Sequence, residues 1–143
     1  MRKLDQDLIN AARNGDLKKV KACLKDGADV QARNNSALRV ASEYGRREVV
    51  KLLIEHGADV HAEGNYALRK STYWGHHEVV KLLIARSADI HIDNDYAVKW
   101  AAKKGHLEVV KLLLLHGANF EAITEDSRTP ELIAFNELLS LGK

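Results

Sequence analysis

The segment His-Glu-Val-Val-Lys at residues 77–81 comes within one residue of a zinc-enzyme motif. Metalloprotease helices carry His-Glu-x-x-His, in which two histidines four residues apart lie on one helix face and bind the metal. In this chain Lys81 stands where the second histidine would be. Whether a metal site exists therefore depends on the other histidines.

The histidines recur at equivalent positions of a 30-residue repeat instead of clustering. They are His56, His61, His76, His77, His91, His106 and His116. Stacked helices lie about 8–10 Å apart, whereas zinc ligands all lie about 2 Å from one ion. Equivalent histidines therefore cannot share a metal, and only His56 and His61 could be brought together by a turn. Two ligands do not make a zinc site, so we expect no metal and no cofactor.

The other reactive residue types also occupy repeat positions. Cys23 aligns with the leucines of later units, which predicts a buried thiol and not a nucleophile. Each of Asp29, Asp59 and Asp89 follows a Gly-Ala or Ser-Ala pair, where a carboxylate accepts hydrogen bonds from turn amides. The chain has no glycine-rich phosphate loop. The sequence therefore predicts that the protein is not an enzyme.

Length and composition are those of one globular domain. The 143 residues are 45% hydrophobic and 29% charged, and the net charge of +2 is too small to predict nucleic-acid or membrane binding by itself. No apolar run approaches the roughly 20 residues of a membrane-spanning helix. The start, MRKLDQDLIN, is too polar for a signal peptide, and one cysteine excludes an internal disulfide. We expect an intracellular protein, cytoplasmic or nuclear.

The repeat organises the whole chain. Glycines at 15, 45, 75 and 105 are each 30 residues apart, as are valines at 20, 50, 80 and 110. We divide residues 1–143, as a single domain, into units at about 4–33, 34–63, 64–93 and 94–123, followed by a capping half-repeat at 124–143. The cap begins its helix with Thr129 as N-cap and Pro130 as first helical residue.

Each unit is predicted to contain two short helices joined by a glycine turn. Neither helix is stable alone at eight or nine residues, so the apolar faces must be buried by stacking neighbouring units. The second helices end at Gly27, Gly57 and Gly117, but at Ser87 in the third unit. If that position is left-handed, Ser87→Gly is expected to stabilise the protein by about 0.5–1 kcal/mol.

The units resemble the ankyrin repeat. Gly-His-Leu-Glu-Val-Val-Lys-Leu-Leu-Leu-Leu-His-Gly-Ala-Asn at 105–119 is similar to that family's pattern, although the usual period is 33. The three missing residues fall where the family builds a β-hairpin finger. The resemblance thus implies an all-α repeat solenoid, an ankyrin stack with short loops or reduced fingers. The 30-residue form is similar to repeats of giant-virus and amoebal ankyrin proteins.

The resemblance also implies a binding surface on the loops and on the concave face of the first helices. Aromatic and basic residues fall at these positions: Tyr44, Tyr66, Tyr73, Trp74, Tyr96, Trp100, Arg39, Arg69, Lys70, Lys99, Lys103 and Lys104. Tyr66 and Tyr96 recur, and partial burial between helices explains them equally well. For Tyr73, Trp74 and Trp100 we favour partner contact, and therefore expect exposed rings on one face.

The sequence favours a monomeric adaptor that binds another protein through this groove. Two other classes remain open. The first is nucleic-acid binding, since basic and aromatic residues alternate there, although nearby carboxylates dilute the charge. The second is a designed or consensus-like scaffold without a native ligand. The family further suggests His61 and His91 as sites for an asparaginyl-type hydroxylase.

Overall fold

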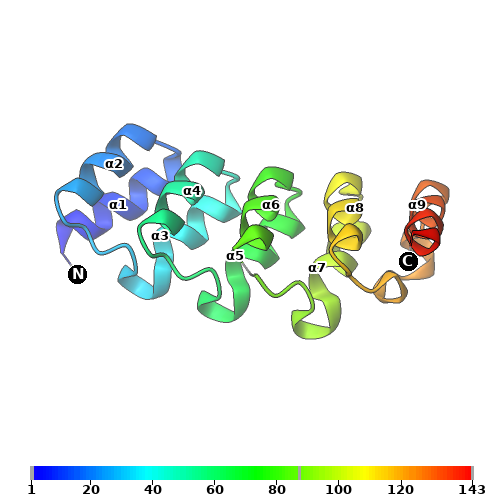
Figure 1. Ribbon diagram of the computed structural model, residues 1–143. Coiled ribbons are helices and arrows are strands. Elements are labelled where there is room, and N and C mark those ends of the chain that lie inside the picture. The colour runs from blue at the N-terminus through cyan, green and yellow to red at the C-terminus, as the bar shows by residue number, and fades with distance from the viewer. Residues whose placement is uncertain (1, 87, 143) are drawn as a thin grey trace.

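The computed structural model describes residues 2–86 and 88–142. Its helices follow one another in pairs along the chain (Figure 1): α1 (Lys3–Asn14), α2 (Leu17–Lys25), α3 (Ala32–Glu43), α4 (Arg47–Glu55), α5 (Ala62–Tyr73), α6 (His77–Ala85), α7 (Ile92–Lys103), α8 (Leu107–Leu115) and α9 (Pro130–Leu141). Two 3-10 helices, η1 (Phe120–Ala122) and η2 (Glu125–Ser127), precede α9. None of the described residues forms a strand, which confirms the all-α repeat stack. Ser87, where we expect glycine to stabilise the protein, lies outside the described residues.

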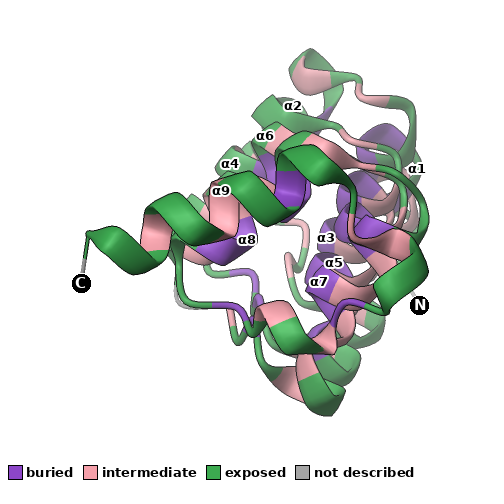
Figure 2. Ribbon diagram, turned by 90° about the vertical axis from the view of Figure 1, so that its right-hand side faces the viewer, coloured by how far each residue is buried: buried purple, intermediate pink, exposed green. Residues whose placement is uncertain are grey.

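The helices form two layers. The first helices α1, α3, α5 and α7 pack in succession against one another, and each also packs against the second helix of its own unit. Figure 1 shows the second helices α2, α4, α6 and α8 as a parallel row above them. The end-on view in Figure 2 places the buried residues between these two rows. A surface that spans several units can therefore form along either row.

The core consists of the repeated apolar residues. In the second unit Leu38 and Ala41 of α3 face Val50 and Leu53 of α4, and all four are at most 1% exposed. Cys23 is buried at the equivalent position of α2, as predicted, and burial raises the pKa of its thiol. Stacking thus supplies the burial that a nine-residue helix lacks alone.

Left-handed turns replace the fingers. Residues 33–35, 63–65 and 93–95 each form a turn with φ between 53° and 62°, directly before the right-handed part of α3, α5 and α7. In the second unit Arg39 closes this turn, because its Nε and Nη2 donate to the carbonyls of Asn34 and Arg33, both at 3.0 Å. Arg69 does the same for Gly64 and Glu63. The prediction of short loops is confirmed.

Replacing Arg33 with glycine is expected to stabilise the protein by about 0.5–1 kcal/mol. Arg33 has a φ of 53°, a region that costs an L side chain about 1–2 kcal/mol and costs glycine nothing. The larger conformational freedom of glycine in the unfolded chain offsets part of this gain. Urea denaturation measures the change. Asn34→Gly is the matched control and should gain less stability, since asparagine tolerates this region. A lower urea midpoint for Arg33→Gly than for the parent protein would contradict the prediction.

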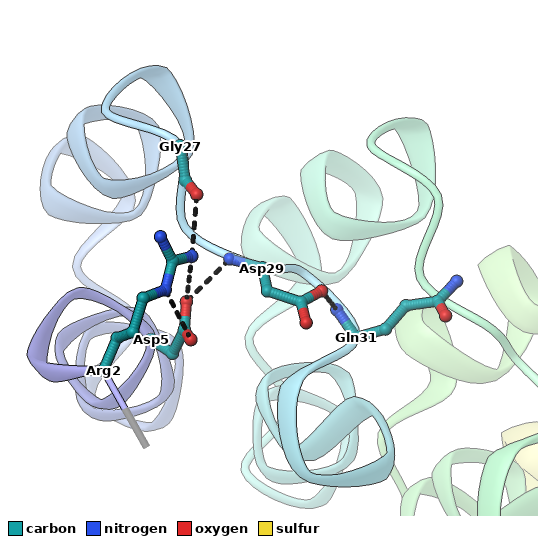
Figure 3. A network of polar contacts seen from close by, with 5 residues as sticks. All are labelled: Arg2, Asp5, Gly27, Asp29 and Gln31. Carbon is teal, nitrogen blue, oxygen red and sulfur yellow. Dashed lines mark hydrogen bonds and ion pairs between the residues drawn. The ribbon is translucent and has the colours of Figure 1, made fainter.

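Polar side chains tie the first helices α1 and α3 to the loops that follow their units. Asp5 Oδ1 accepts from the Asp29 amide at 2.7 Å, and Asn35 Oδ1 accepts from the Asp59 amide at the same distance. Figure 3 shows the first of these contacts, in which the guanidinium of Arg2 also reaches Asp5 and the carbonyl of Gly27. The Asp29 amide, together with Arg2, holds the pKa of Asp5 below its usual range. A buried polar residue at this position therefore fixes the loop after the first unit and the loop after the second.

Asp5→Asn is expected to reduce the loss of stability in acid. A depressed pKa in the folded state stabilises the protein above the unfolded-state pKa of about 4, and this contribution is lost as the pH falls through the folded-state pKa. Asparagine keeps the acceptor oxygen, as Asn35 shows, but does not titrate in this range. Melting temperatures between pH 6 and 3 measure the effect, with the exposed Asp26→Asn as control. If the melting temperatures of Asp5→Asn and of the parent protein fall equally between pH 6 and 3, the prediction is wrong.

The C-terminal cap is seated differently from the earlier first helices. Its start is as predicted, because Thr129 Oγ1 accepts from the Leu132 amide at 3.2 Å and Pro130 follows. However, α9 packs mainly against α8, and its C-terminal half extends past the stack in Figure 2. Leu132 is buried, whereas Leu138 and Leu141 are exposed. The last unit is thus only partly covered.

Candidate partner-binding site

Aromatic rings from α5 and α7 form a continuous row across two units. The centroids of Tyr73 and Trp100 lie 5.8 Å apart, and those of Trp100 and Tyr96 lie 5.9 Å apart. Trp74 meets Tyr73 edge-on, at 5.1 Å and an interplanar angle of 79°. We call these four rings, together with Tyr66, which is joined to Tyr73 through Lys70, the aromatic row. The structure therefore brings together the rings of the third and fourth units that the sequence singled out.

Basic side chains cover the faces of these rings. Lys104 Nζ lies 4.6 Å from the centroid of Tyr73, and Lys103 Nζ lies 4.7 Å from that of Trp100. Lys70 Nζ lies 5.6 Å from the centroid of Tyr66 and 5.9 Å from the centroid of Tyr73. Such cation–π contacts contribute about 0.5–1 kcal/mol each at exposed sites. The row therefore presents alternating positive charge and flat apolar surface.

Two rings stand out by their exposure. Trp74 is 54% exposed, as expected, and Tyr44, at the same position of the preceding unit, is 51% exposed. Together with Glu43 and His76 they line a pocket of about 360 Å³. Tyr73 and Trp100 are half-buried instead of freely exposed, because they pack against each other and their neighbours. Tyr44 and Trp74 are thus the rings with most surface left to contact another molecule.

Other candidate residues also have a structural role. The Tyr66 hydroxyl donates to Glu43 Oε1 of the preceding unit, and its pKa rises to about 12 because of burial and that bond. Tyr66 and Tyr96 are half-buried, as the alternative interpretation predicts. The guanidinium groups of Arg39 and Arg69 hold turn carbonyls and also lie 5.2 Å and 5.8 Å from the Tyr66 centroid. Their charges are therefore partly committed within the protein.

The histidines after the repeat glycines join neighbouring units. His76 Nε2–H donates to the carbonyl of Glu43 at 2.8 Å, and His106 Nε2–H donates to that of Tyr73 at 2.8 Å. Arg46 Nε donates to the carbonyl of Arg13 at 3.0 Å in the same way. The sequence did not reveal this role. Its signal is the donor side chain that directly follows the glycine in the second, third and fourth units.

The remaining histidines bond locally. His56 and His116 contact the carbonyls of Leu52 and Leu112 within their own helices, both at 2.9 Å. His61 Nδ1 lies 3.1 Å from Asn65 Oδ1. Residues 2–86 and 88–142 hold no cluster of three or more potential metal ligands. The carboxylates after the Gly-Ala and Ser-Ala pairs accept from turn amides, as predicted: Asp29 from Gln31, Asp59 from His61 and Asp89 from His91.

A family model described as ankyrin repeats (3 copies) matches residues 8–94 and 75–138. No curated protein matches. Among the described residues no helix is both long and apolar enough to cross a membrane. Ankyrin repeats are in general protein–protein interaction modules. By its stacked helix pairs and by this match, the chain belongs to the ankyrin-repeat family.

Proposed function

We propose that the protein is a non-catalytic adaptor that binds a partner protein along the first-helix layer. The exposed pair Tyr44 and Trp74 carries this proposal. Tyrosine and tryptophan are enriched at the energetic centres of protein interfaces, where they fill pockets on the partner or accept its side chains. Here both rings line a pocket of about 360 Å³, and Trp74 also contacts Tyr73 of the aromatic row.

The charges support a protein partner over a nucleic acid. Single-stranded nucleic acid needs a basic groove that follows the phosphates and open ring faces on which bases stack. Arg39 and Arg69 are held by turn carbonyls, and Lys103 and Lys104 cover ring faces of the row. Glu43 adds a carboxylate beside Tyr44 and Trp74. This mixed surface suits a polypeptide with apolar and acidic side chains.

Affinity capture with two matched baits tests the proposal. One bait carries Tyr44→Ala and Trp74→Ala, and the other carries Lys51→Ala and Lys81→Ala on the second helices α4 and α6. Quantitative mass spectrometry should find a protein that the parent chain and the lysine variant retain and the aromatic variant loses. Equal recovery of every partner by the two variants would contradict the proposed surface, and recovery of nucleic acid alone would contradict the protein partner.

A further inference from the structure

Each repeat glycine at the end of α1, α3 and α5 lies beneath a side chain of the next unit. A Cβ atom added to these glycines would lie 2.8 Å, 2.6 Å and 2.5 Å from that side chain. The same side chain donates to a carbonyl at the end of the preceding first helix, at 3.0 Å, 2.8 Å and 2.8 Å. We call a glycine, the carbonyl of the residue two positions before it and the space above them a socket. The sockets are filled as follows: Gly15 by Arg46, Gly45 by His76 and Gly75 by His106.

The fourth socket, at Gly105, has the same backbone, but none of residues 2–86 and 88–142 fills it. Its φ is 77°, close to the 72–75° of the other three glycines. Within the described part of the chain, no atom lies within 4 Å of a Cβ added to Gly105. The carbonyl of Lys103 corresponds to the carbonyls of Glu43 and Tyr73, which accept from His76 and His106. No side chain in the described part of the chain donates a hydrogen bond to the Lys103 carbonyl.

The cap leaves room at this socket. A pocket of about 470 Å³ lies between the end of α7, the start of α8 and the segment that leads into α9. Ala102, Leu107 and Val110 line it from the stack, and Pro130 and Leu132 line it from the cap. Leu139 is the cap residue that corresponds to His106 when Thr129 is aligned with Tyr96; it lies within α9, not at a helix start, and its side chain has no donor. The cap therefore provides no donor at the position that fills the other sockets.

We propose that this fourth socket binds a histidine side chain that a partner polypeptide presents at the start of a helix. The socket continues the series of contacts between units, and in the two preceding ones the occupant is the histidine before a second helix, α6 or α8. The imidazole would cover Gly105 while its Nε2–H donates to the carbonyl of Lys103. The exposed charges of Lys103 and Lys104 favour a neutral imidazole over a guanidinium.

A peptide that copies residues 75–88, with blocked termini, is the probe. It places a histidine before a helix start, as in the filled sockets. Titration of the whole protein with this peptide should shift the amide resonances of Lys103 and Gly105. The same peptide with alanine in place of its first histidine should bind about tenfold more weakly or worse, because it lacks both the ring and the donor.

Two glycine variants make the assignment specific. Gly105→Ala puts a methyl group where the ring would lie and should weaken binding of the histidine peptide about tenfold. Gly57→Ala has comparable backbone strain, with a φ of 95°, and no described atom within 4 Å of its added Cβ. It should bind as the parent protein does.

Three results would overturn the assignment. The first is equal binding of the histidine and alanine peptides. The second is unchanged affinity in Gly105→Ala, or shifts confined to the aromatic row. The third is self-association of the chain that Gly105→Ala abolishes, which would assign the socket to a second copy. Because the resonance shifts are measured on the parent protein, the test stands even if Gly105→Ala folds poorly.

Discussion

Gly75→Ala is expected to destabilise the protein by about 2–4 kcal/mol, whereas Gly105→Ala should cost only about 1–2 kcal/mol. Both residues are left-handed, so alanine is strained at either position. Only at Gly75 would the new Cβ also lie 2.5 Å from the His106 ring, which must move and release the Tyr73 carbonyl. The difference between the two variants isolates the contribution of the socket contact.

Urea denaturation of the two variants measures this difference. Gly45→Ala should resemble Gly75→Ala, because its Cβ would lie 2.6 Å from His76. Gly57→Ala should resemble Gly105→Ala, since no described atom lies near its Cβ. Equal destabilisation by all four changes would show that backbone strain alone matters and that the sockets do not couple the units.

Replacing both Tyr44 and Trp74 with alanine is expected to weaken binding of a captured partner at least about a hundredfold. Each ring is more than 50% exposed in the free protein, so its removal costs little in folding. In a complex, truncation of an aromatic side chain at the centre of an interface costs about 2 kcal/mol or more. Isothermal titration of the purified partner measures the affinity.

The control for this change lies on the other layer. Lys51 and Lys81 are exposed on α4 and α6 at equivalent repeat positions, and their joint replacement with alanine should leave the affinity unchanged. Melting curves of both variants must match that of the parent protein. A folded aromatic variant that binds normally would place the interface elsewhere on the molecule.

The sequence predicted the helix pairs and the core because both repeat with the same period. Val50 recurs in all four full units, Leu53 recurs in the third and fourth, and a glycine ends each first helix, so helix position and buried face could be assigned without side-chain geometry. Short loops followed from the three missing residues. Their left-handed form did not, because Arg33 and Glu63 ordinarily avoid that region. Closing bonds from Arg39 and Arg69 stabilise the turns of the second and third units.

Contacts between units were harder to predict because they join residues distant in sequence. His106 bonds to a carbonyl 33 residues earlier, and Trp100 packs on a ring 27 residues earlier. Both contacts depend on how one unit is set against the next, which the repeat period alone does not specify. The same limit explains why Tyr73 and Trp100 were expected to be exposed but are half-buried. The packing of α9 against α8 likewise depends on the loop through η1 and η2.

Photocrosslinking from position 74 tests the central claim, that a partner protein binds along the first-helix layer. Benzoylphenylalanine replaces Trp74 in one variant and Lys81 in another. Both residues are exposed; Trp74 directly follows α5, and Lys81 lies on α6. With a purified partner at saturating concentration, we predict a covalent adduct from position 74 and none from position 81. An adduct from position 81 alone would contradict the account, because the partner would then bind on the second-helix layer.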